Sequence, residues 1–310
     1  MKLCGVQMLW LGVCAWWPVW GAESQAPPSL NAVLQRYSHL GQAFAVPLAY
    51  APFPHPARES GYTYKSYVYR RDGHYHDPRV AVFIPKGFRE GATVDLVVYF
   101  HGWLTRLSEL FPKFSLIEEF AASGKNALLV VPQGPRDAPD SFGGKLEDPD
   151  GFRKFVEDLL ETLQEEKKLR TTRPGQIILA GHDGGYQVMA AILERGGLTA
   201  QIREVYLFDA LFGQADKFAA WLETHRGKLR LIYTPYAGTR TQTEEFFASL
   251  QSKGQPAVMV AESEYSASML ATNRILFIAS QLGHDEVVAQ NHAFRDFLKA
   301  SSLENIPSAR

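Results

Sequence analysis

The chain has 310 residues, 46% of them hydrophobic, and its 32 basic and 33 acidic residues leave a formal net charge of −1. This length and hydrophobic content allow one large core or two small ones. No basic block interrupts the balanced charge, which argues against nucleic-acid binding and against attachment to anionic membranes, since both need concentrated positive charge.

Residues 1–21 are typical of a signal peptide. Lys2 precedes a short apolar run, and Val19 and Gly21 are the small residues expected before a cleavage site near Ala22. The run is too short for a comfortable bilayer span, so no stable span is expected once it is removed. Both cysteines lie in this segment, so the mature chain would have no disulfide. We expect an exported protein, periplasmic or secreted, with a lipoprotein attached through Cys14 as the minority alternative.

Residues 22–60 are rich in Pro, Ala and Ser and contain one helical patch near residues 30–40. They are expected to form an arm laid over a domain. Strands are predicted from the alternating tyrosines between Tyr62 and Tyr69, and again over residues 79–85. Between these strands, "HYHD" (residues 74–77) contains metal-ligand residue types, but a polar hairpin loop is the more usual reading and no matching ligand cluster follows. We therefore expect no metal and no other cofactor.

From Val94 onward, predicted strands and helices alternate. This pattern is typical of an α/β domain with a mostly parallel central sheet and helices on both faces. No linker separates the units, so residues 61–310 are expected to form one domain. The strands are expected at residues 94–100, 126–133, 176–181, 204–210 and 228–236, with 256–262 and 274–280 competing for the last one; the helices are expected at residues 114–123, 151–163, 185–197, 217–225, 241–252 and 291–301.

Asp183 stands at the centre of the sequence Gly-His-Asp-Gly-Gly, between an apolar strand and an amphipathic helix. A strand–turn–helix with small residues at both ends of a five-residue turn is typical of a nucleophile elbow. Gly181 and Gly185 permit the close approach of strand and helix, and the central residue is strained and projects above the sheet.

This elbow, together with the His101-Gly102 that ends the strand at residues 94–100, resembles the α/β-hydrolase superfamily, over roughly residues 94–300. The motifs are most similar to those of small bacterial exported hydrolases, which carry serine at the position of Asp183. The resemblance implies an α/β-hydrolase fold. No inserted helical block separates the late strands, so no large cap domain is expected.

The resemblance also implies positions for an oxyanion hole and a general base. The backbone N–H groups of Trp103 and Gly184 would form the oxyanion hole. The base would be a histidine beyond the last strand. His284 suits that position better than His292, which is expected in the final helix as a surface or capping residue.

The acid that orients the base would end a late strand, as Asp209 does. Its alternative role is to cap the next helix. Asp285 is the weaker candidate because neighbouring side chains seldom align for a hydrogen bond between histidine and aspartate.

Asp183 is a poor nucleophile for ester cleavage but suits displacement at saturated carbon, followed by hydrolysis of the alkyl–enzyme ester. Its elbow resembles that of epoxide hydrolases and haloalkane dehalogenases, although Gly184 stands where those usually carry tryptophan. Their cap domain, which supplies acidic tyrosines or halide donors, is absent. Tyr186 or Tyr236 could replace those groups, but each is more typical of a packing residue.

Three interpretations remain open. The chain is a hydrolase of a small molecule with Asp183, His284 and Asp209 as nucleophile, base and orienting acid, or with Asp183 as a general base on water. Alternatively, it is a degenerate serine-hydrolase homologue that binds a ligand or partner without turnover. A purely structural exported protein is the third interpretation, and it leaves the surviving motifs unexplained.

Overall fold

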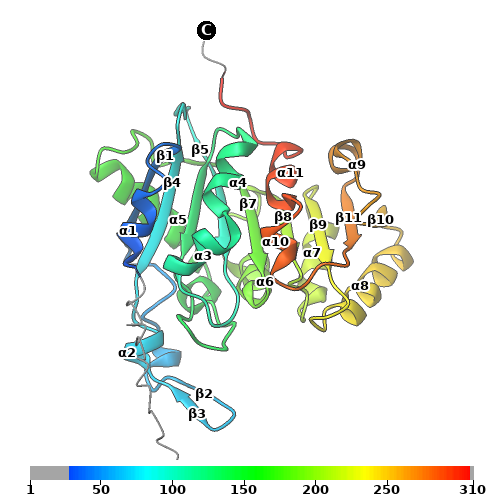
Figure 1. The fold of residues 1–310 in the computed structure, drawn as a ribbon, viewed down its shortest axis with the longest axis horizontal. Helices are drawn as coiled ribbons and strands as arrows, with labels where there is room; N and C mark the ends of the chain where they lie inside the picture. Colours follow the sequence, from blue (N-terminus) through cyan, green and yellow to red (C-terminus); the bar gives the residue numbers. More distant parts are fainter. Residues whose placement is uncertain (1–27, 308–310) are drawn as a thin grey trace, which may run out of the picture.

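A nine-stranded sheet forms the centre of the described chain, residues 28–307 of a computed structural model (Figure 1). The expected signal peptide lies outside the described residues. Across the sheet the strands are ordered β1 (Gly41–Pro47), β4 (Arg79–Pro85), β6 (Leu128–Pro132), β5 (Val94–Phe100), β7 (Pro174–His182), β8 (Ile202–Phe208), β9 (Lys228–Tyr233), β11 (Ile275–Ala279) and β10 (Ala257–Ala261). β4 runs antiparallel to its neighbours β1 and β6, and the other pairs are parallel.

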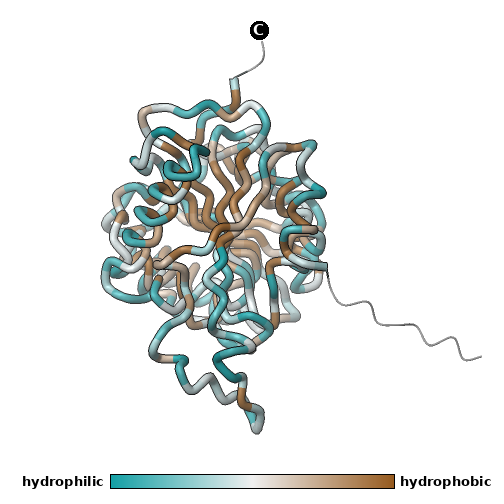
Figure 2. The backbone as a smooth tube through the Cα atoms, turned by 90° about the vertical axis from the view of Figure 1, so that its left-hand side faces the viewer, coloured by the Kyte–Doolittle hydropathy of each residue, from teal (hydrophilic) through white to brown (hydrophobic). Residues whose placement is uncertain are grey.

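Helices cover both faces of this sheet and enclose its apolar strands (Figures 1 and 2). One core cluster packs under α5 (Gly151–Glu165), α6 (Gly185–Arg195), α7 (Ala215–Thr224) and α8 (Arg240–Ser252). The other packs under α1 (Leu30–Gln35), α3 (Leu107–Phe114), α4 (Leu116–Ser123), α9 (Ala267–Thr272), α10 (Glu286–Ala289) and α11 (Ala293–Lys299).

β5 shows why the strands in the middle of the sheet have apolar side chains on both faces. Leu96 and Val98 belong to one core cluster, whereas Val97 and Tyr99 belong to the other. Successive side chains of a strand point to opposite faces, and both faces are covered by helices here. The predicted α/β class, with a mostly parallel sheet between two helical layers, is confirmed.

Several elements differ from the sequence expectation. Residues 41–47 of the expected arm form the edge strand β1, which the sequence pattern did not predict because its burial does not alternate cleanly. Of the polar loop expected at residues 74–77, His74 ends the short helix α2 (Arg71–His74), and residues 75–77 are in neither a helix nor a strand. The expected helix at 114–123 is α4, which begins at Leu116. The helix before it, α3, was not predicted, and Ser115, whose φ is 47°, separates the two. Both candidates for the last strand are strands, β10 and β11.

The alternating tyrosines form a separate hairpin of β2 (Tyr62–Tyr64) and β3 (Tyr67–Tyr69) that projects from the lower edge in Figure 1. Two 3₁₀ turns, Pro56–Arg58 and Gly144–Glu147, lie in the connections. The carboxyl ends of the parallel strands meet at this same edge, which is where α/β folds of this type place their sites. Within residues 28–307, no helix has the length and apolar character needed to cross a bilayer.

Candidate active site

Asp183 lies in a sharp turn between β7 and α6, with a left-handed φ of 50°. Gly185 is needed here because a Cβ at that position would lie 2.7 Å from the backbone oxygen of Phe100. Gly102 is needed for a similar reason: its Cβ would lie 2.4 Å from the Cβ of Asp183. The turn therefore pushes the Asp183 side chain over the end of β5, in a conformation that is costly for a non-glycine residue.

Three loops bring the predicted side chains Asp183, His284 and Asp209 together. His284, in the loop after β11, donates from Nδ1 to Oδ2 of Asp209 at 2.8 Å. Its Nε2 lies 3.5 Å from Oδ1 of Asp183. One imidazole therefore bridges two carboxylates, with Asp209 fully buried and Asp183 in contact with solvent.

Asp209 is held by more than its histidine. The backbone N–H and the hydroxyl of Thr234 donate to its two carboxylate oxygens at 3.1 and 2.8 Å, and the Thr239 hydroxyl donates as well. Burial alone would raise the pKa of Asp209, but the hydrogen bonds from His284, Thr239 and Thr234 outweigh it and the pKa is lowered. The sequence reasoning missed both threonines, since no motif marks them.

Asp183 is likewise held as an anion. Its Oδ2 accepts the backbone N–H of Trp103 at 2.7 Å. Burial would raise the pKa of Asp183, but His284 and the Trp103 N–H more than offset this and the pKa lies below its usual value. These hydrogen bonds keep the carboxylate charged.

His284 is consequently protonated at neutral pH. Partial burial would lower its pKa, but the hydrogen bonds and charges of Asp183 and Asp209 prevail and raise the pKa to about 9. The resting site is an imidazolium between two carboxylates. This state is unlike that of a free general base, which must be neutral before it can accept a proton.

His182 packs directly beneath this pair. Its ring centroid lies 4.4 Å from that of His284, and its Nε2 donates to the His284 carbonyl at 3.0 Å. Burial and the neighbouring His284 lower the pKa of His182 to about 4. His182 is therefore a neutral support that fixes the backbone of the loop carrying His284, a role that sequence reasoning did not assign.

The predicted oxyanion-hole residues line the elbow, but one donor is already engaged. The Trp103 N–H points to the carboxylate of Asp183 rather than to an empty position. The Trp103 indole donates from Nε1 to the Ser141 hydroxyl at 2.8 Å, and both side chains lie within 3 Å of the place that a Cβ on Gly184 would occupy. Gly184 is the N-cap residue of α6.

His101 fixes the loop that carries Trp103. Its Nδ1 donates to the Gly102 carbonyl at 2.8 Å, and its Nε2 accepts the Gly134 N–H at 2.9 Å. Burial lowers the pKa of His101. This neutral histidine ties the ends of β5 and β6 together, which explains the His-Gly motif without a direct catalytic role.

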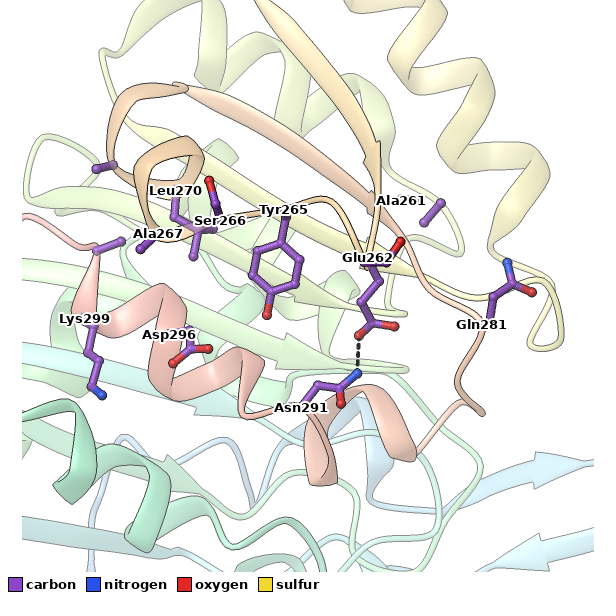
Figure 3. Close-up of a pocket in the computed structure, with 14 residues that line it drawn as sticks. Ala261, Glu262, Tyr265, Ser266, Ala267, Leu270, Gln281, Asn291, Asp296 and Lys299 are labelled. Atoms are coloured by element: carbon purple, nitrogen blue, oxygen red, sulfur yellow. Dashed lines mark hydrogen bonds between the residues drawn. The ribbon is translucent and has the colours of Figure 1, made fainter.

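One small cavity lies beside the elbow. The cavity lined by Gly184, Ser141 and Val188 measures about 20 Å³, room for a single water molecule. A much larger cleft of about 1090 Å³ lies at the far edge of the sheet, between β10, α9 and α11, where Asn291 donates to Glu262 (Figure 3). None of the three predicted catalytic residues lines that cleft.

The alternative residues lie elsewhere. His292 is the N-cap residue of α11, as its capping interpretation expected, and its Nδ1 lies 2.7 Å from Glu119 Oε1. Asp285 forms an ion pair with Lys113 at 2.8 Å. His74 donates to the Arg136 carbonyl, and residues 28–307 contain no group of three or more His, Cys, Asp or Glu residues placed to hold a metal ion.

The two tyrosines considered as proton donors differ in position. Tyr186 is partly buried, near enough to Asp183 for its charge to add to the burial that raises the pKa of the phenol. Tyr236 is 70% exposed, in the loop after β9.

No described protein family matches the sequence, and no curated protein does. Solved structures, in contrast, match the fold. A feruloyl esterase module from Clostridium thermocellum, complexed with sinapinate, is 10% identical, with a TM-score of 0.51 over 84% of this chain and 93% of that one. A fluorophosphonate-binding serine hydrolase from Staphylococcus aureus is 9% identical, with a TM-score of 0.50 over 85% of this chain and all of that one. The chain has the α/β-hydrolase fold.

Proposed function

We propose that the protein is a hydrolase in which Asp183 opens an epoxide. One observation carries the proposal: the two oxygens of Asp183 have different surroundings. Oδ2 is fixed by the Trp103 N–H, whereas Oδ1 faces His284 Nε2 at the longer distance of 3.5 Å. An anchored carboxylate with one oxygen left for attack is what displacement at saturated carbon requires.

In the first step, Oδ1 attacks an epoxide carbon and the carbon–oxygen bond of the ring breaks. The departing oxygen takes the Nε2 proton of the His284 imidazolium. Asp183 becomes a neutral ester and His284 becomes neutral. The loss of the Asp183 charge lowers the pKa of His284, because one of its two carboxylate partners is gone.

In the second step, neutral His284 is the base that removes a proton from water. The water attacks the ester carbonyl carbon, and the negative charge that develops on Oδ2 is stabilised by the Trp103 N–H. The tetrahedral intermediate then collapses: the imidazolium of His284 protonates the departing oxygen of the diol, and the carboxylic acid formed at Asp183 passes its proton to His284, which restores the carboxylate and the imidazolium. Asp209 keeps the imidazole oriented throughout through its bond to Nδ1.

The protonation state favours epoxides over haloalkanes. Opening an epoxide consumes the imidazolium proton and so creates the base for the second step. Expulsion of a halide consumes no proton and leaves His284 charged. Tyr186 is the alternative proton donor, since it lies near Asp183.

A degenerate serine-hydrolase homologue that binds a ligand is the second candidate. Two observations favour it: the cavity beside the elbow holds only about 20 Å³, and the Trp103 N–H is already bonded to Asp183. Under either function we propose that the protein is exported, as the sequence of residues 1–21 predicts.

The test is turnover of an epoxide panel in heavy-oxygen water, beside panels of esters and haloalkanes. Repeated cycles are expected to place the label in the Asp183 carboxylate, read by mass spectrometry of its peptide. Asp183→Asn is expected to abolish turnover, and Asp285→Asn, which alters an exposed carboxylate nearby, is expected to retain it.

Turnover without label in Asp183 would exclude the covalent route. If no epoxide is turned over and Asp183→Ser gains hydrolysis of a short activated ester, the degenerate homologue replaces the proposal.

A further inference from the structure

Exposed apolar side chains gather at one edge of the molecule. Five of the six large ones exposed within residues 28–307 lie there, and we call these five the apolar rim: Tyr67 (62% exposed), Val68 (47%), Trp103 (38%), Leu104 (58%) and Tyr236 (70%). The sixth, Tyr50, packs beside α5, where its backbone N–H bonds to Asp158. Scattered single exposures are ordinary, whereas a cluster of this kind indicates an interaction surface.

Three separate segments contribute the rim. Tyr67 and Val68 belong to the β2–β3 hairpin, which projects beyond the sheet (Figure 1). The hairpin is joined to the next segment by an edge-on contact between the rings of Tyr64 and Trp103, with centroids 5.4 Å apart. Tyr236 follows β9, and its N–H bonds to Thr234, which also holds Asp209. The rim therefore lies around the mouth of the Asp183 site.

The N-terminal part of the chain joins the molecule at this same edge. Pro28 lines a cleft together with Arg79, Arg106 and Gln133. Arg79 begins β4, which runs antiparallel, and Gln133 follows the end of β6, so both mark the carboxyl edge of the parallel strands. Pro28 therefore lies at the edge that also carries the apolar rim.

The chemistry of the rim fits a lipid surface. Tyrosine and tryptophan prefer the boundary between headgroups and acyl chains, where an apolar ring and a polar group are both satisfied. Lys65, at the turn of the hairpin, has its Nζ 5.4 Å from the centroid of the Tyr64 ring. A lysine side chain in such a place can bury its apolar methylene groups while its ammonium group reaches the lipid headgroups.

We propose that the apolar rim docks on the surface of a lipid bilayer, with Asp183 facing the membrane. A protruding hairpin and single projecting side chains suit insertion between headgroups better than they suit a flat protein interface. Binding arises from apolar burial and not from a basic patch, in agreement with the balanced charge of the chain. The proposal rests on no step of the Asp183 mechanism.

Co-sedimentation with phosphatidylcholine vesicles tests the proposal. The protein is used from Ala22 onward, since the whole sheet and both helical layers lie within residues 28–307. The unchanged chain is expected to sediment with the vesicles and to remain bound in high salt, which would weaken purely electrostatic attachment. The double variant Tyr67→Ser/Val68→Ser is expected to lower the partition coefficient by about tenfold or more, because two inserting side chains are lost. Tyr236→Ser is expected to lower it less.

Tyr50→Ser is the matched control, since it removes an exposed tyrosine that packs beside α5 and is not one of the five rim side chains, and it is expected to leave binding unchanged. Unfolding temperatures compared across the variants separate loss of docking from loss of fold. The proposal is overturned if the unchanged chain stays in the supernatant, or if the hairpin variant binds as well as the control. A rim-dependent dimer in solution, detected by light scattering without vesicle binding, would assign the surface to a second copy instead.

Discussion

Two neighbouring histidines of the site, His182 and His284, are in opposite protonation states. His182 is buried, and burial together with His284 lowers its pKa to about 4. His284 has its pKa raised to about 9 by two carboxylates that outweigh its partial burial. Their ring centroids are only 4.4 Å apart. Neighbouring imidazoles are thus neutral and charged at the same pH.

The comparison teaches that proximity to a charge is not sufficient to protonate a histidine. His182 lies near Asp183 and Asp285, but its Nε2 donates to a carbonyl and its ring is removed from water. His284 bonds directly to Asp209 and faces Asp183. Direct contact with a carboxylate and partial access to solvent decide the charge.

The largest expected effect is that of removing the buried partner of His284. Asp209→Ala leaves a partly buried imidazolium and two threonine hydroxyls without their acceptor, so the free energy of unfolding is expected to fall by about 3–5 kcal/mol. Urea unfolding at pH 7 measures it. Asp285→Ala, which removes an exposed ion pair with Lys113, is the control and is expected to change stability by about 0–1 kcal/mol. Equal effects of the two variants would mean that burial does not distinguish the carboxylates.

The second expected effect is a change in the pKa of His284 that does not occur in His182. Asp183→Asn removes one carboxylate from His284, so its pKa is expected to fall from about 9 by about 1–3 pH units. NMR titration of the imidazole carbons measures this. His182 is expected to remain neutral above pH 6 in both proteins. An unchanged pKa of His284 would show that Asp209 alone sets it.

The same raised pKa makes stability depend on pH. A histidine whose pKa is higher in the folded state than its unfolded value, near ~6.5, contributes stability that is complete below that value and is lost as the pH rises through the folded pKa. The free energy of unfolding is therefore expected to decline between pH 7 and about 9. His284→Gln is expected to flatten this decline, and a profile as steep as that of the unchanged protein would contradict the assignment.

The smallest expected effect on stability concerns the hydrogen bond between Trp103 and Ser141 beside the elbow. Ser141→Ala removes the acceptor of the Trp103 indole N–H, and the cost is expected to be about 0.5–1.5 kcal/mol. The indole is then expected to move more freely, so hydrogen exchange of its N–H, followed by NMR, should become faster. Unaltered exchange would mean that the contact between the Tyr64 and Trp103 rings alone holds the indole.

Part of the site could be read from local sequence. Gly181, Gly185 and the strand–turn–helix around Asp183 form a contiguous pattern, because close packing at a sharp turn demands small residues at fixed spacing. The carboxyl end of the strand before Asp209 could likewise be placed. The threonines that hold Asp209, and Ser141 beside Trp103, come from segments far apart in sequence, and no periodicity relates them to their partners.

The fold shows the same division. Strands covered on both faces, such as β5, have apolar side chains on both faces and were predicted, whereas β1 lies at the edge with incomplete burial and was not. The tyrosines from Tyr62 to Tyr69 alternate as a strand should, but only the tertiary structure shows that their hairpin stands outside the main sheet.

By itself, the sequence determined the layered α/β architecture and the presence of a carboxylate at the elbow, because periodic burial and a glycine-flanked turn are local properties. The tertiary structure decided the charge of that site. Whether an imidazole is neutral or protonated depends on burial and on which carboxylates reach it, and those are set by loops after β7, β8 and β11 that meet only when the sheet is assembled.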